Sequence, residues 1–135
     1  MKIVLDTNCL IQSFSPHSRH YEIWLSFTKG ENVLCVSNDI IEEYIEILQK
    51  LFNFSLAENV VKTIINSNFV EYVTPYFNFN LIEADPDDNK FVDCAIAANA
   101  RYVVSNDHHF DILRYISFPS VDVIVLDDFL KLVQK

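Results

Sequence analysis

One stretch, residues 88–107 (DNKFVDCAIAANARYVVSND), constrains the fold more than any other part of the chain. Its pattern predicts a helix over residues 88–99, a tight turn, and a buried strand over residues 102–105. The helix is apolar or small on most of its faces, which is typical of a helix in a protein interior. Asp93 nevertheless lies inside it, and a buried carboxylate is very costly unless a partner compensates its charge. The stretch therefore raises the question of what Asp93 faces.

Apolar runs and helical spacing alternate along the rest of the chain. Short apolar runs predict further strands over residues 2–5, 32–36, 69–73 and 122–126. Helices are expected over residues 20–28, 37–52 and 55–67, and from residue 127 or 128 to 134, with a helical turn at 108–111 and an irregular segment at 75–86. Gly30 supplies a turn, and Ser55 to Glu58 matches a capping box. This alternation predicts a three-layer α/β/α fold with a central, mostly parallel sheet of about five strands.

Length and composition are consistent with one domain over residues 1–135. No apolar run reaches the roughly 18 residues that a membrane span needs, and the N-terminus does not read as a signal peptide. Cys9, Cys35 and Cys94 are widely spaced in apolar segments, which is typical of reduced core thiols. We therefore expect a cytoplasmic protein with no membrane partner.

The chain is acidic, with 10 Lys and Arg against 19 Asp and Glu and a net charge of −9. This charge argues against a protein that coats nucleic acid non-specifically, because such binding depends on clustered basic residues. Two divalent ions held by converging carboxylates would, however, raise the local charge by about +4. The net charge therefore weakens a nucleic-acid hypothesis and does not exclude it.

Several carboxylates stand where parallel strands end or where helices begin. Asp6 follows the first expected strand, Glu43 lies in the first turns after the second, and Asp107 follows the strand over residues 102–105. These positions face one edge of a parallel sheet, where α/β proteins bind ligands, although Asp6 could equally only cap the next helix. Converging carboxylates repel one another unless they are protonated or bind cations. Oxygen ligands of this kind suit Mg²⁺ or Mn²⁺, which can activate water for phosphodiester hydrolysis.

The same residues carry a family resemblance over the whole chain. The opening IVLDTN, the segment SNDIIEEYIEIL and the segment DPDDNKFVDCAIAANARYVVSNDHHF resemble the motifs of PIN-domain ribonucleases, which include the VapC-type toxins. The resemblance implies a PIN-like fold and a Mg²⁺- or Mn²⁺-dependent endoribonuclease that hydrolyses RNA. It also implies a role as the toxin of a type II toxin–antitoxin pair, with RNA as substrate, a small antitoxin protein as partner, and a homodimer.

The resemblance assigns the site residues. The catalytic residues are expected to be Asp6, Glu43, Asp93 and Asp107; Asp88 joins them as a metal ligand, and the supporting polar groups are Thr7, Asn8, Ser105 and Asn106. The third acid stays open between Asp88 and Asp93, because family members place it at either position. The apolar helix favours Asp93, and Asp88 is either a ligand or only the N-cap of the helix.

Other polar residues near these motifs are expected to be solvated. We interpret His108 and His109 as exposed loop residues in preference to a proton shuttle or a phosphate contact, and Asp85 and Asp87 as turn residues. Two other functions compete with the nuclease. One is a catalytically inactive PIN-fold module that binds RNA or protein. The other is a phosphohydrolase of the haloacid dehalogenase type, which requires a second Asp where this chain has Asn8.

Overall fold

The structure is a computed structural model that describes residues 1–134. Its five strands are β1 (Lys2–Leu5), β2 (Val33–Val36), β3 (Val70–Tyr72), β4 (Tyr102–Val104) and β5 (Val123–Ile124). They form one sheet in the order β3-β2-β1-β4-β5, and every neighbouring pair is parallel. The central strand β1 places Ile3 opposite Leu34 on one side and opposite Tyr102 on the other.

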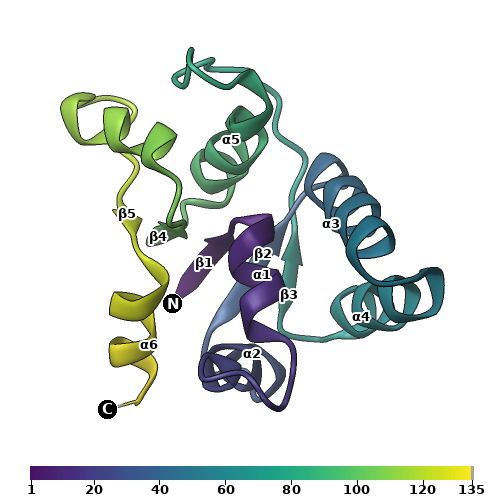
Figure 1. Cartoon of the computed structure of the whole chain (residues 1–135). Coiled ribbons are helices and arrows are strands. Elements are labelled where there is room, and N and C mark those ends of the chain that lie inside the picture. The colour runs from purple at the N-terminus through teal and green to yellow at the C-terminus, as the bar shows by residue number, and fades with distance from the viewer. Residues whose placement is uncertain (135) are drawn as a thin grey trace.

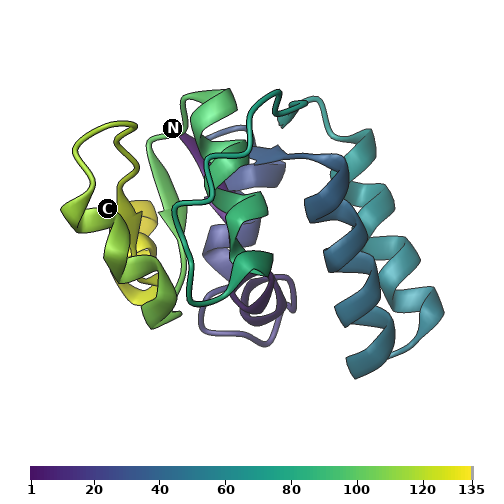
Figure 2. The same cartoon turned by 90° about the horizontal axis from the view of Figure 1, so that it is seen from above.

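Helices connect the strands on both faces of this sheet. They are α1 (Thr7–Ser13), α2 (Tyr21–Thr28), α3 (Asn38–Leu51), α4 (Phe54–Asn66), the 3₁₀ turn η1 (Pro86–Asp88), α5 (Asn89–Ala98), the 3₁₀ segment η2 (His108–Tyr115) and α6 (Leu126–Gln134). Figure 1 shows α5 on one side of the sheet and α2 and α6 on the other. In Figure 2, α3 and α4 lie side by side as a pair beside this body. The predicted three-layer fold with a parallel five-stranded sheet is confirmed.

The core consists mainly of strand residues and of the helix faces that cover them. Ile3, Val4 and Leu5 of β1 are fully buried. On one face Phe27 of α2 stacks against Phe129 of α6, and on the other Phe91 of α5 packs at an angle against Phe110 of η2. Each fully buried side chain of this size stabilises the fold by about 1.5–3 kcal/mol. Helices therefore cover both faces of β1, and this packing fixes the position of Asp6 at the end of the strand.

The three cysteines lie in this core as free thiols. Burial raises the pKa of Cys9 and of Cys35 to about 12, and it raises the pKa of Cys94 as well. Thiols of this kind are neutral and unreactive near pH 7. The expectation of reduced core thiols is confirmed. Among residues 1–134, no helix is long and apolar enough to cross a membrane.

Helix and strand ends differ from the predicted ones at a few places. α4 begins at Phe54, because the side chain of Asn53 accepts a hydrogen bond of 2.8 Å from Leu56 N, so the capping box proposed at Ser55 is wrong. β5 spans two residues and α6 starts at Leu126, earlier than predicted. The helical turn after β4 continues to Tyr115. Within the described chain, the segment between β3 and η1 carries no helix or strand, as predicted.

Two turns depend on residues in the left-handed region of backbone space. Gly30 has φ +78, and an added Cβ would lie 2.7 Å from a ring carbon of Phe69, so only glycine fits there. Asn99 ends α5 with φ 54 and ψ 47, a conformation that asparagine adopts more readily than most residues. The tight turn predicted between the buried helix and β4 is formed in this way.

Candidate active site

The strand order places the candidate site at the carboxyl ends of β1 and β4. The chain leaves β1 toward β2 and leaves β4 toward β5, so the order reverses between these two neighbours. Such a reversal opens a crevice above the strand ends, where open α/β sheets bind ligands. Asp6 follows β1 directly, and Ser105 and Asp107 follow β4.

Asp6 is 7% exposed, and both of its carboxylate oxygens are hydrogen-bonded. Oδ1 accepts from Thr7 N at 2.8 Å, which caps α1, and Oδ2 accepts from Ser105 Oγ at 2.8 Å. Asp6 therefore both caps α1 and lies at the site, the two roles between which the sequence did not decide. Burial raises the pKa of Asp6 to about 6, with smaller contributions from the charges of Glu43 and Asp107, while the two hydrogen bonds oppose the rise.

Glu43 reaches the same site from the second turn of α3. Its Oε2 accepts a hydrogen bond from Thr7 Oγ1, and its Oε1 forms an ion pair of 2.8 Å with Lys90 Nζ of α5. Both side chains of the pair are largely buried, with 22% and 20% exposure. Lys90 thus compensates the charge of one acid of the group in this structure.

Asp88 lies at the N-terminus of α5 and is 9% exposed. Its side chain makes no capping hydrogen bond, and its Oδ2 is buried without a hydrogen-bond partner among the described residues. Burial raises the pKa of Asp88 to about 7, the charges of Asp85, Asp107 and Asp6 add to the rise, and the nearby ring of His109 opposes it. The N-cap alternative raised from the sequence therefore does not account for this side chain.

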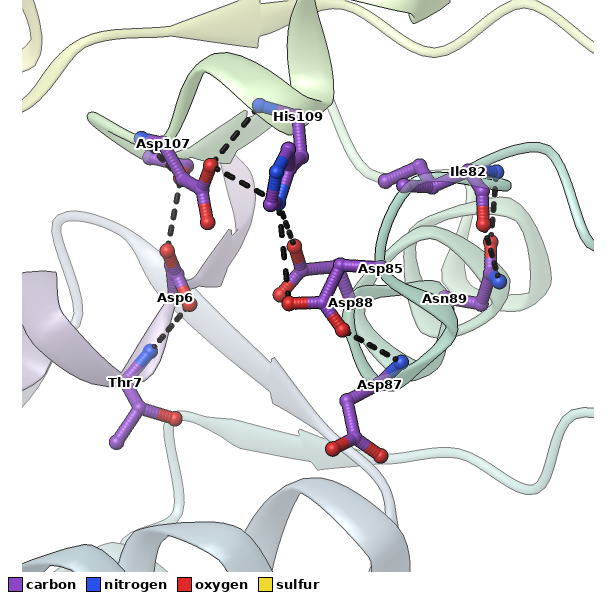
Figure 3. Close-up of polar contacts among 10 residues, drawn as sticks. Asp6, Thr7, Ile82, Asp85, Asp87, Asp88, Asn89, Asp107 and His109 are labelled. Carbon is purple, nitrogen blue, oxygen red and sulfur yellow. Dashed lines mark hydrogen bonds and ion pairs between the residues drawn. The ribbon is translucent and has the colours of Figure 1, made fainter.

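Asp107 caps η2 and brings a histidine toward the acids. Its Oδ1 accepts a hydrogen bond of 2.9 Å from His109 N. The ring Nδ1 of His109 lies 3.4 Å from Asp107 Oδ1, 3.4 Å from Asp88 Oδ2 and 3.7 Å from Asp85 Oδ2, and Figure 3 shows these side chains converging. Both histidines are exposed, as interpreted from the sequence: the side chain of His108 is 96% exposed and that of His109 is 45% exposed. His109 differs from His108 in that its ring lies beside the acids.

Asp85 and Asp87 lie in the turn before α5, as interpreted from the sequence, but their carboxylates point in different directions. Asp85 turns Oδ2 toward His109 while its Oδ1 accepts from Asp87 N at 3.2 Å. Asp87 is exposed, and its carboxylate points away from the group in Figure 3. Asp107 caps the turn that carries His109 two residues later, and this Asp-x-His spacing is the sequence signal that could have indicated the histidine's direction.

Asp93 lies apart from these acids although it is equally buried, at 6% exposure. Its Oδ1 accepts a hydrogen bond of 3.2 Å from Phe79 N. Burial raises the pKa of Asp93, the Phe79 bond opposes the rise, and no other carboxylate contributes. The side chain borders a cavity of about 450 Å³ between α5 and residues 73–79. The structure thus brings Asp6, Glu43, Asp88 and Asp107 together and leaves Asp93 beside a backbone amide.

The expected supporting groups take different positions around the acids. Ser105 Oγ donates to Asp6 and accepts from Asp107 N at 3.0 Å, which ties the ends of β1 and β4 together. Asn106 Oδ1 accepts from Leu126 N at 2.9 Å at the start of α6. Asn8 and Asn106 also line a cavity of about 360 Å³ beside the acids; its other lining residues are Asp6, Ile11, Gln12, Leu51 and Asp107. A small phosphate-bearing group could reach the carboxylates from this cavity.

The donor set of this site fits a divalent cation. Carboxylate oxygens are the ligands that Mg²⁺ and Mn²⁺ prefer. Oδ2 of Asp88 has no hydrogen-bond partner among the described residues. Burial is the main cause of the raised pKa values of Asp6 and Asp88, and the charges of neighbouring acids add to it, so the group has little compensating positive charge around it. A bound cation would satisfy the orphaned oxygen and favour the ionised form of each acid.

Comparisons with known proteins agree with this architecture. A search of curated proteins finds no match. A chain of VapBC2 from Rickettsia felis, solved bound to a DNA fragment from its promoter, superposes with a TM-score of 0.64 at 17% identity, over 93% of this chain and 98% of that one. The PIN-domain endonuclease Utp24 superposes with a TM-score of 0.54 at 14% identity, over 92% of this chain and 84% of that one. The family model of the PIN domain matches residues 2–109, so the chain belongs to the PIN-domain family.

Proposed function

We propose that this protein is a metal-dependent endoribonuclease that hydrolyses RNA phosphodiester bonds, and that it is the toxin of a type II toxin–antitoxin pair. The observation that carries the proposal is the convergence of Asp6, Glu43, Asp88 and Asp107 around the carboxyl ends of β1 and β4. One buried oxygen of Asp88 also has no hydrogen-bond partner within residues 1–134. Membership in the PIN-domain family and the fold shared with an endonuclease support it.

In this proposal Asp6, Asp88 and Asp107 hold Mg²⁺ or Mn²⁺, and Glu43 completes the acid set. When bound, the ion supplies an activated water and positive charge at the scissile phosphate. Ser105 holds Asp6 and the backbone of Asp107 in place, and Thr7 holds Glu43. Lys90, now paired with Glu43, can donate to a phosphate oxygen if an ion takes its place beside the acid.

Asp93 is not part of this proposed ligand set, although the sequence favoured it. Five residues separate it from Asp88, which is a rotation of about 140° around an α-helix. The hydrogen bond from Phe79 N provides a partner for Asp93 without a metal. We therefore assign the third acid to Asp88.

The proposed partners are an RNA substrate and a small antitoxin protein. The VapBC2 neighbour was solved as a toxin–antitoxin complex on promoter DNA, which supports the antitoxin. An antitoxin that presents an Arg or Lys to the acids would neutralise them as a metal does. A homodimer and a cytoplasmic location remain predictions from the sequence.

Cleavage of a fluorescently labelled single-stranded RNA tests the function directly. We expect cleavage by the wild-type protein in Mg²⁺ or Mn²⁺, none after chelation with EDTA, and none by Asp6→Asn. Asp87→Asn, which removes an exposed charge beside Asp88, is the control and should cleave normally. Cleavage in EDTA at the wild-type rate would refute the metal dependence. An absence of divalent-ion binding by calorimetry would favour the inactive binding module.

A further inference from the structure

We propose that Asp85, Asp88 and His109 form a second cation site, for a transition-metal ion of the Zn²⁺ type, at the junction of η1 and η2. The three side chains each offer one ligand atom, and these atoms all lie within 4.8 Å of one another. The site shares Asp88 with the proposed nuclease centre and so extends it, but its other two ligands are outside the four acids. Figure 3 shows the histidine ring directed between the two carboxylates.

Two of the three distances between the proposed ligand atoms are close to those of a metal site, and the third is below 4.8 Å. His109 Nδ1 lies 3.4 Å from Asp88 Oδ2 and 3.7 Å from Asp85 Oδ2. Ligand bonds of about 2.1 Å to a tetrahedral ion place neighbouring ligand atoms about 3.4 Å apart. These atoms could therefore coordinate one ion with little movement of the backbone.

Hydrogen bonding within the protein does not explain the arrangement. Each Nδ1 carries at most one proton, yet three carboxylate oxygens, from Asp85, Asp88 and Asp107, surround it at 3.4–3.7 Å. All three distances exceed those of a normal N–H···O hydrogen bond. Asp88 Oδ2 remains buried and without a hydrogen-bond partner in the described chain. A metal ion with several coordination positions would bind His109 Nδ1, Asp85 Oδ2 and Asp88 Oδ2 together, whereas Asp107 Oδ1 already accepts a hydrogen bond from His109 N.

The imidazole nitrogen determines the kind of ion. Mg²⁺ prefers oxygen ligands and keeps several waters, so it suits the carboxylates of Asp6 and Asp107 better. Imidazole nitrogens and carboxylate oxygens are both ligands of Zn²⁺, and imidazole suits Zn²⁺ and other first-row transition metals better than it suits Mg²⁺. Because Asp85 and Asp88 flank η1 while His109 lies in η2, the ion would join two segments that are distant in the sequence.

Calorimetric titration with Zn²⁺ in a large excess of Mg²⁺ tests the site, since Mg²⁺ occupies the carboxylate centre. We expect one Zn²⁺ per chain for the wild type, and at least tenfold weaker binding for His109→Gln and for Asp85→Asn. His108→Gln is the matched control because His108 is fully solvated beside His109; it should bind Zn²⁺ as the wild type does. Equal affinity of the wild type and His109→Gln, or equal losses in His109→Gln and His108→Gln, would overturn the proposal.

A further variant separates this site from the nuclease centre. Asp6→Asn should bind Zn²⁺ within about threefold of the wild type while it loses RNA cleavage. If Asp6→Asn weakens Zn²⁺ binding as much as His109→Gln does, the ion belongs to the carboxylate centre and the second site is refuted. RNA cleavage that proceeds equally well without Mg²⁺ or Mn²⁺ refutes the metal dependence of the proposed nuclease instead, and it leaves the Zn²⁺ result unaffected. Co²⁺ bound in place of Zn²⁺ should show visible absorption that His109→Gln abolishes.

Discussion

Asp88, which precedes α5, and Asp93 within α5 are both more than nine-tenths buried and have opposite surroundings. Asp88 at the start of α5 faces Asp85, Asp107 and Asp6, and one of its oxygens has no hydrogen-bond partner in the described chain. Asp93 in the middle of α5 faces the backbone amide of Phe79 and an apolar cavity. Burial alone therefore does not mark a catalytic acid. The group that surrounds the carboxylate does.

The difference lies in how each charge is compensated. A backbone N–H already directed at Asp93 gives that carboxylate a permanent partner inside the fold. The neighbours of Asp88 are themselves acidic, apart from His109, so compensation of its negative charge requires a bound cation. The negative charge of a structural acid is compensated by groups of its own chain, whereas that of a functional acid is compensated only when a ligand binds.

The sharpest test of this comparison is the pair Asp88→Asn and Asp93→Asn. Mutation of a group that only orients a metal ligand typically costs 10- to 100-fold in activity, so loss of a ligand should cost more than about 100-fold. We therefore expect Asp88→Asn to lose RNA cleavage by more than that factor and Asp93→Asn to remain within about threefold of the wild type. Initial rates at saturating Mn²⁺ measure both. A larger loss in Asp93→Asn than in Asp88→Asn would reverse our assignment of the third acid.

Local sequence patterns were sufficient to predict most of the fold. Apolar runs identified the strands, helical spacing identified the helices, and the right-handedness of parallel crossovers implies layers on both faces. The acids of the site were predictable in part for the same reason. Asp6 and Asp107 directly follow strands, and the carboxyl ends of parallel strands necessarily meet at one edge of the sheet.

The choice between Asp88 and Asp93 depends on non-local structure. It requires the rotational phase of α5 against the sheet and the path of residues 73–84, whose irregular backbone has no periodic signal. Phe79 N reaches Asp93 only because that path crosses α5. The position of His109 beside Asp85 and Asp88 depends on non-local structure as well, since its direction is set by the turn that Asp107 caps.

A smaller effect is expected at Ser105, which supports the acids without being one of them. Ser105→Ala removes the hydroxyl that binds Asp6 Oδ2 and Asp107 N, so cleavage should fall by about 10- to 100-fold. Ser105→Thr keeps the hydroxyl and is the matched control, with activity near that of the wild type. Comparable activity in the Ala and Thr variants would show that the fold alone positions Asp6.

Asp93 should affect stability more than activity. Asp93→Ala leaves the amide of Phe79 without its acceptor, which should lower the free energy of unfolding by about 1–3 kcal/mol. Asp93→Asn retains an acceptor oxygen and should cost less than about 1 kcal/mol. Urea denaturation followed by circular dichroism measures both values. If the two variants are equally unstable, the hydrogen bond from Phe79 is not what stabilises this carboxylate.

The weakest effect concerns pH and the metal-free protein. Asp6 and Asp88 have pKa values raised from 3.8 to about 6 and about 7, so the folded state holds protons that the unfolded state has released. The free energy of unfolding should therefore fall as pH rises from 6 to 8, by about 2 kcal/mol in total, most of it from Asp88.

Asp88→Asn should flatten the pH dependence of the free energy of unfolding between pH 6 and 8. Saturating Mn²⁺ should make the wild-type protein more stable at pH 8 than at pH 5, because the ion binds the ionised acids. Asp93→Asn should leave the Mn²⁺ effect intact, since no acid of the site contributes to the pKa of Asp93. Thermal unfolding with and without Mn²⁺ at each pH measures these shifts. If Mn²⁺ changes the pH dependence of stability equally in Asp88→Asn and Asp93→Asn, then neither of these two carboxylates binds the ion.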